Sequence, residues 1–104
     1  MRIGKGTIVW VKNRQMLGII LDEPMGIGRW KVTSWNDLTF FCIENLNELI
    51  PLFRIDPKDL KLSREKICEK YLMNFLSAIF ELLGELSSTF KNWQESHIEH
   101  YHTP

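Results

Sequence analysis

The sequence predicts an α+β fold, mainly β in its N-terminal part, in which a small β-barrel precedes a long α-helix. Short runs rich in β-branched and aromatic residues alternate with turn residues over 7–43. Over 64–93, apolar residues recur instead at helical spacing. At 104 residues, the chain has room for one compact domain with an appended helix.

Glycine, proline and polar residues divide the N-terminal part into strands. Gly18 lies inside the second strand, where the missing side chain indicates a bulge or a close backbone approach. Residues 44–51 predict a single helical turn, and Asp56 followed by proline predicts an N-capped turn. Four strands are expected at 7–12, 16–21, 29–35 and 38–43, and a fifth, closing the barrel, at 52–54.

A helix is expected over 63–94, because Ser63 is a good N-cap and apolar residues follow at alternating spacings of four and three. The resulting stripe is wider than a narrow coiled-coil seam. Its residues are Leu72, Phe75, Leu76, Ile79, Leu82, Leu83 and Leu86. The chain is therefore divided into a barrel at 1–55, a linker or turn at 56–62, an amphipathic helix at 63–94 and a flexible tail at 95–104.

Sequence motifs in the first half of the chain match a known barrel pattern. A Gly-x-x-Val-x-Val strand spans 6–11, and Gly18-Ile19 leads into the second strand. The third strand ends in alternating residues that include Val32, and a short turn after the fourth strand carries Leu46. This arrangement resembles the SH3-like barrels of the Tudor and KOW type. It is also similar to short uncharacterised SH3-like proteins of phages and bacteria. The resemblance covers about half of the chain and implies a binding module on an SH3-like β-barrel.

Composition and charge narrow the class of protein. The 44% apolar and 25% charged content is ordinary for a globular chain. Residues 1–35 carry six basic and two acidic side chains, whereas the remainder carries seven basic and eleven acidic ones. This asymmetry fits either an anionic partner for the basic part or attraction between the two parts. Two isolated cysteines, no signal-peptide core and no long uncharged apolar run predict a soluble, cytoplasmic protein without a membrane partner.

Strand alternation places several aromatic and basic side chains on one face if the strand valines point inward. Such a face would stack bases and contact phosphates of RNA or DNA, or form a Tudor-like cage for a methylated cation. Alternatively, the C-terminal helix covers this face and the tryptophans belong to the core. The residues of this candidate ligand face are Trp10, Lys12, Arg29, Lys31, Trp35 and Phe40.

Catalytic and metal-binding patterns are weak. Gly26-x-Gly28 is too short for a phosphate-binding loop, and Cys42 has no nearby histidine in the sequence. His97 and His100 are best interpreted as part of a solvated tail, since no cysteine lies close enough to complete a zinc set. We therefore expect no enzyme activity, cofactor or metal. The leading hypothesis is a protein interaction or assembly module, with the helix binding another protein or a second copy; the alternative is a nucleic-acid-associated protein of the KOW or Tudor kind.

Overall fold

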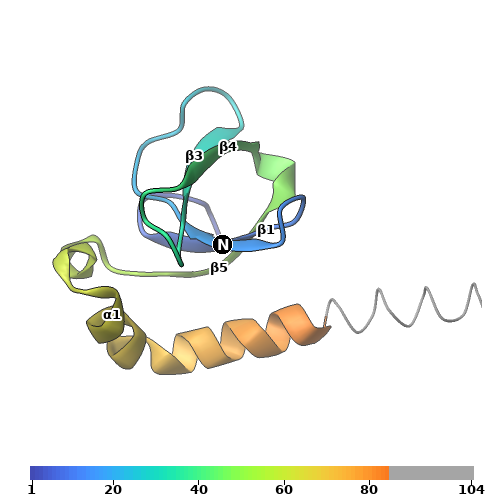
Figure 1. Ribbon diagram of the computed structural model, residues 1–104. Coiled ribbons are helices and arrows are strands. Elements are labelled where there is room, and N and C mark those ends of the chain that lie inside the picture. The colour runs from blue at the N-terminus through green and yellow to red at the C-terminus, as the bar shows by residue number, and fades with distance from the viewer. Residues whose placement is uncertain (85–104) are drawn as a thin grey trace, which may run out of the picture. The chain divides into compact units, whose positions relative to one another are not determined.

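The computed structural model describes residues 1–84 of the chain (Figure 1). They belong to two compact units, one formed by residues 1–71 and the other beginning at Leu72. Leu86 of the predicted stripe, the helix expected over 85–94 and the tail with its histidines lie outside the described residues. The first unit combines a five-stranded antiparallel sheet with short helices, which confirms the α+β class.

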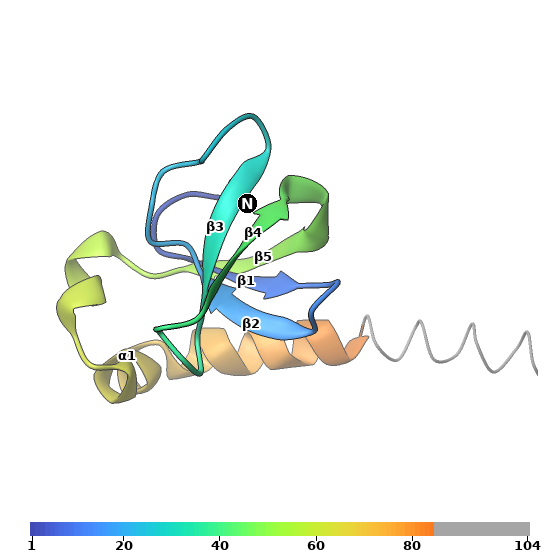
Figure 2. The same cartoon turned by 45° about the horizontal axis from the view of Figure 1, so that its top comes forward.

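The sheet has the strand order β4-β3-β2-β1-β5, so β1 to β4 form a meander and β5 returns to pair with β1 (Figure 2). Every ladder is antiparallel, and the register between β1 and β5 shifts at Ile8/Val9. The strands are β1 (Thr7–Val11), β2 (Met16–Ile19), β3 (Arg29–Ser34), β4 (Phe41–Asn45) and β5 (Leu49–Arg54).

The prediction of a closed barrel is wrong, because no ladder joins the outer strands β4 and β5 within the described residues. The chain leaves β4 through a short 3-10 helix, η1 (Leu46–Glu48), instead of a tight hairpin. The Leu46 N–H bonds to the Gly28 carbonyl at 2.7 Å, and the Glu48 carbonyl accepts from the Lys12 N–H at 2.9 Å. These bonds direct the chain from β4 across to β1, where β5 pairs.

The fourth strand begins three residues later than the sequence predicts. The Asp37 carboxylate accepts hydrogen bonds from the backbone N–H and the hydroxyl of Thr39, at 3.0 and 2.6 Å, and this local turn delays the strand to Phe41. The fifth strand begins earlier than predicted and includes Pro51. β5 is an edge strand, where a residue without an N–H is tolerated.

Branched side chains from the strands build the core on one face of the sheet. Val9, Val11 and Val32 are fully buried there, which confirms that the strand valines point inward. Ile3, Met16 and Trp30 pack around them as partly buried residues. The buried cluster consists of Val9, Val11, Ile20, Val32, Cys42 and Leu49.

Gly18 is the point of closest approach in this core. A Cβ at this position would lie 2.3 Å from Cγ1 of Val32 and 3.1 Å from the carbonyl oxygen of Thr33. The first distance leaves no room for a methyl group, and the second requires the carbonyl to move by a few tenths of an ångström. The close approach predicted from the sequence is thus confirmed, whereas the register shift lies elsewhere, between β1 and β5.

The opposite face of the sheet is also apolar. Ile8 and Ile19 lie opposite each other on paired strands and are buried. The 3-10 helix η2 (Pro57–Lys61) and the helix α1 (Arg64–Lys70) follow β5 in the chain. Ile19 and Trp35 line an apolar cavity of about 210 Å³ together with Leu60 of η2 and Ile67 of α1. The short helices therefore cover this face.

The prediction of one uninterrupted helix is wrong, because the helix breaks at Tyr71 within the described residues. Its start is confirmed: the Ser63 hydroxyl oxygen accepts from the Lys66 N–H at 3.3 Å. However, α1 ends at Lys70, Tyr71 has non-helical torsion angles (φ −107°, ψ 22°), and the chain is helical again over 72–84.

Contacts of the Tyr71 side chain explain the interruption. Its ring stacks on Phe53 with centroids 6.2 Å apart, and its hydroxyl accepts from the Asp56 N–H at 3.0 Å. The same hydroxyl donates to the Asp59 carboxylate at 2.7 Å. These partners lie on β5, at the N-cap of η2 and within η2, so the predicted linker at 56–62 is tied into the first unit. Asp56 also caps η2 as predicted, by accepting from the Lys58 N–H at 3.1 Å.

Candidate interaction surface

The helical segment over 72–84 presents large apolar side chains to solvent. Of the predicted stripe, Leu72, Leu76, Ile79 and Leu83 are exposed, whereas Phe75 and Leu82 are half-buried. Exposed apolar groups three and four positions apart form a continuous surface, since residues at these spacings are neighbours on a helix. Isolated exposed leucines are common on protein surfaces, but a contiguous apolar patch typically marks an interaction site.

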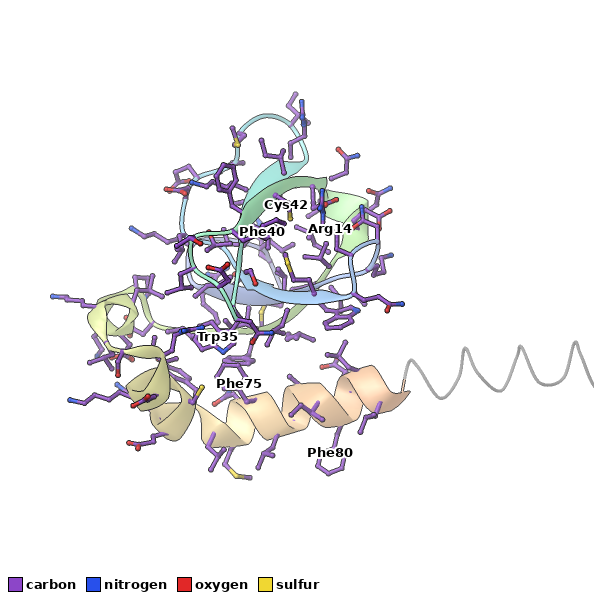
Figure 3. All side chains as sticks on the ribbon, viewed as in Figure 1. Arg14, Trp35, Phe40, Cys42, Phe75 and Phe80 are labelled. Atoms are coloured by element: carbon purple, nitrogen blue, oxygen red, sulfur yellow. The ribbon has the colours of Figure 1, made fainter. Side chains whose placement is uncertain are left out.

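Met73 and Phe80 extend this surface and are its most exposed members, at 72% and 73%. Phe80 projects outward from the helix (Figure 3). Neither residue is among the predicted site residues. The sequence signal that reveals them is their own spacing, because Met73, Leu76, Phe80 and Leu83 follow one another at intervals of three, four and three. We call the exposed set Leu72, Met73, Leu76, Ile79, Phe80 and Leu83 the helix stripe.

The six residues of the candidate ligand face do not come together. Trp10 and Phe40 line one open hollow of about 610 Å³, with Arg14 and Asn36 at its sides. Trp35 is instead only 9% exposed and lies beside α1. The carbonyl oxygen of Trp35 accepts from the Arg64 guanidinium at 2.7 Å. For Trp35, the structure agrees with the alternative in which a helix covers this side of the sheet.

The basic residues of that face are separated from its aromatic pair. Lys31 projects from β3, with its ammonium 4.5 Å from the centre of the Phe41 ring and 3.7 Å from a carboxylate oxygen of Asp22. Arg29 begins the same strand, and Lys12 follows β1; both are exposed. Phosphate binding favours several cations along one track, and none of these three cations lines the hollow that holds Trp10 and Phe40.

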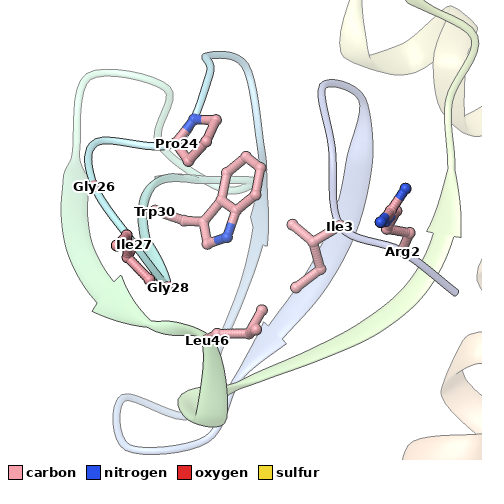
Figure 4. A pocket seen from close by; sticks show the side chains of 8 residues that line it. All are labelled: Arg2, Ile3, Pro24, Gly26, Ile27, Gly28, Trp30 and Leu46. Atoms are coloured by element: carbon pink, nitrogen blue, oxygen red, sulfur yellow. The ribbon is translucent and has the colours of Figure 1, made fainter.

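A second hollow, of about 620 Å³, was not predicted from the sequence (Figure 4). Trp30 and Ile3 lie at its centre, and Leu46 and Pro24 lie at its edges. Arg2 is the one charged residue that lines it. The lining is mostly apolar and contains no carboxylate, imidazole or thiol, so it offers no acid–base or nucleophilic group. Trp30 was not singled out because it lies on the inward face of β3, together with Val32.

Glu44 is the first of two buried carboxylates. It accepts from Nδ2 of Asn13 at 2.9 Å and from Nε of Arg14 at 2.5 Å. The Arg14 hydrogen bond is the main cause that lowers the pKa of Glu44. Burial raises the pKa of the neighbouring Cys42 thiol, which disfavours the nucleophilic thiolate. The bonds from Asn13 and Arg14 to Glu44 therefore hold the β1–β2 turn against β4.

Asp59 is the second buried carboxylate. Beside the Tyr71 hydroxyl, it accepts from the Lys70 ammonium at 3.0 Å. The Tyr71 hydrogen bond, followed by the one from Lys70, lowers the pKa of Asp59, and the same contact raises the pKa of Tyr71. These groups satisfy one another and hold η2 against α1. Within residues 1–84, no group of three histidine, cysteine or acidic side chains is arranged to bind a metal.

None of the helices in the described part of the chain is long and apolar enough to cross a membrane. Comparisons with protein-family models, with curated proteins and with solved structures gave no match. Function is therefore inferred from the residues of this chain.

Proposed function

We propose that the protein is a non-enzymatic interaction module, in which a compact sheet unit carries an apolar helix that binds another protein chain. The observation that carries the proposal is the helix stripe: six large apolar side chains, 40–73% exposed, within a segment of thirteen residues. Glu81 is the one charged residue in this segment. A helix with so wide an apolar face gains stability only when that face is covered.

The size of the effect supports a protein partner. Burying an exposed leucine, isoleucine or phenylalanine completely contributes about 1.5–3 kcal/mol. The stripe residues are about half exposed, so covering all six contributes about 6 kcal/mol from this chain alone. A partner that buries a similar apolar area doubles this contribution. The doubled value falls within the range of about 4–15 kcal/mol that association costs in lost translational and rotational freedom. The stripe thus supports a moderate or reversible complex.

The sheet unit is proposed to be an SH3-like scaffold for this helix. What supports this proposal is the strand arrangement: four consecutive antiparallel strands, the return of β5 to β1 and the short turn with Leu46 before β5. Both buried carboxylates of the described unit are taken up by structural partners: Glu44 by Asn13 and Arg14, and Asp59 by Lys70 and Tyr71. This structural use of the two carboxylates supports the non-enzymatic proposal.

Nucleic-acid association is the second proposal, and it has less support. Trp10 and Phe40 do share one hollow, which is the arrangement that base stacking needs. The cation beside them, Arg14, is already paired with Glu44, and Trp35 is buried. This proposal predicts salt-sensitive binding of single-stranded RNA or DNA that weakens when Trp10 is replaced by alanine, with Trp10→Phe as the control that retains a stacking ring.

Site-specific photo-crosslinking tests the interaction proposal. A photoreactive benzoyl-phenylalanine at position 80 should form intermolecular adducts in cells that produce the full chain, because Phe80 lies on the helix stripe. The same probe at Glu65, an exposed position of α1, serves as the control and should form few adducts. Introducing Ile79→Asp should remove the adducts from position 80. Adducts exclusively within one chain would show that the stripe packs on its own protein, and the proposal would then be wrong.

A further inference from the structure

The exposed residues of the helix stripe follow the spacing of a coiled-coil seam. Leu72, Leu76, Ile79 and Leu83 are separated by four, three and four residues, which is the alternation of d and a positions in a heptad repeat. All four are exposed in the structure. The half-buried Phe75 and Leu82 are themselves seven residues apart. The seam is thus a different line along the helix from the one that passes through Phe75 and Leu82.

Flanking positions fit close pairing of two helices. Met73 and Phe80 occupy equivalent e positions beside the seam and widen its apolar area. Asn74 and Glu81 occupy f positions, which lie farthest from the seam. The one charge of the segment therefore stays in solvent when two such helices pair, and two identical copies bring no like charges together.

The seam also matches itself when its direction is reversed. The spacing four-three-four is the same read from either end, so in an antiparallel pair Leu72 faces Leu83 of the other copy and Leu76 faces Ile79. Such a contact is isologous, as most two-fold interfaces are.

We propose that the partner of the helix stripe is a second copy of this chain, bound antiparallel through Leu72, Leu76, Ile79 and Leu83. The proposal rests on the interaction function proposed above. Chain connectivity favours the antiparallel arrangement, because each folded unit of residues 1–71 is attached to the start of its helix. Antiparallel helices separate the two attachment points by about 20 Å, the length of thirteen helical residues, whereas parallel helices place both units at one end, about 10 Å apart.

Sedimentation equilibrium of the full chain tests the pairing. The wild type should have twice the monomer mass of 12.3 kDa, and Ile79→Asp with Leu83→Asp should return it to the monomer mass. Asn74→Asp with Ser77→Asp adds the same charge outside the seam and should keep the dimer. A wild type that stays monomeric at every concentration, or one with the mass of three or more chains, overturns the pairing.

Cysteine crosslinking tests the direction of the helices without a destabilising charge. In a Cys68→Ser background, a chain with Leu72→Cys is mixed with a chain with Leu83→Cys and oxidised. Disulfides between the two different chains support the antiparallel pair, and disulfides only between identical chains overturn it. The two proposals also fail separately. If the chain is monomeric and position 80 forms photo-adducts with other proteins, self-pairing is overturned and the interaction function stands. If the adducts form only within one chain, both proposals are overturned.

Discussion

Replacing Gly18 by alanine should destabilise the protein through a clash in the core. The added methyl carbon would lie 2.3 Å from Cγ1 of Val32 and 3.1 Å from the Thr33 carbonyl oxygen. Ordinary carbon–carbon contacts are about 3.5–4.0 Å, so Val32 must move by about an ångström or more, or β2 and β3 must separate. Val32 is fully buried and surrounded by other core side chains, which restricts its movement.

The expected magnitude follows from the cost of overpacking. Forcing an extra methyl group into a packed core typically costs about 1–3 kcal/mol, and we expect Gly18→Ala to lie in the upper half of that range. Val32→Ala removes two methyl groups and should cost about 2 kcal/mol on its own. In the double variant, the methyl group added at position 18 occupies space that Cγ1 of Val32 has left. The double variant should therefore be more stable than the sum of the single effects by at least about 1 kcal/mol.

Urea unfolding followed by circular dichroism measures all three free energies of unfolding. Gly26→Ala is the matched control, because a Cβ at Gly26 meets no atom within 4 Å and its φ is not positive. This control should change the stability by less than about 1 kcal/mol. If Gly18→Ala unfolds at the wild-type urea concentration, or if the two single effects simply add, the proposed contact between β2 and Val32 is wrong.

Three further predictions concern the ionisable groups. The Arg14 hydrogen bond lowers the pKa of Glu44, so the stabilising contribution of Glu44 is present near neutral pH and is lost as the pH falls through that lowered pKa. The urea midpoint of Glu44→Gln should therefore change less than that of the wild type between about pH 5 and pH 3. Tyr71→Phe should lower the melting temperature at about pH 7, and the difference from wild type should narrow as the pH falls through the lowered pKa of Asp59, where that carboxylate becomes protonated. The Cys42 thiol, whose pKa burial raises, should resist a thiol reagent at about pH 8 in the native protein and react in urea; equal rates in both states would contradict its burial.

Local sequence signals predicted a strand correctly where its formation depends on only a few neighbouring residues. The β-branched run from Thr7 to Val11 and the alternation around Val32 were sufficient to find β1 and β3. The start of β4 was missed because the Asp37 side chain bonds to Thr39 only two residues away and extends the turn. That signal is present in the sequence, since aspartate and threonine at this spacing favour a local turn, but an apolar run beginning at Leu38 outweighed it.

The alternation of a strand predicts which side chains share a face, but it does not say what covers that face. Trp10 and Trp35 were expected on one exposed side with Phe40. The structure leaves Trp10 and Phe40 at a hollow, whereas Trp35 is covered by residues that follow it by about thirty positions, including Arg64. Whether distant residues cover a side chain depends on the tertiary structure. In this chain, that difference distinguishes Trp35 from Trp10, although strand alternation places both on the same face.

The interruption at Tyr71 shows the same limit for the helix, and it changes what the stripe can do. The spacing of apolar residues passes through Tyr71 without a break, so periodicity alone predicts one helix. The break is instead fixed by bonds to Asp56 and Asp59, fifteen and twelve residues away, and by the stacked ring of Phe53. Because those contacts hold Tyr71 to the sheet unit, the helical residues that follow form a separate unit. A separate helix, unlike one continuous with α1, is able to expose an apolar seam to a partner while the sheet keeps its own core.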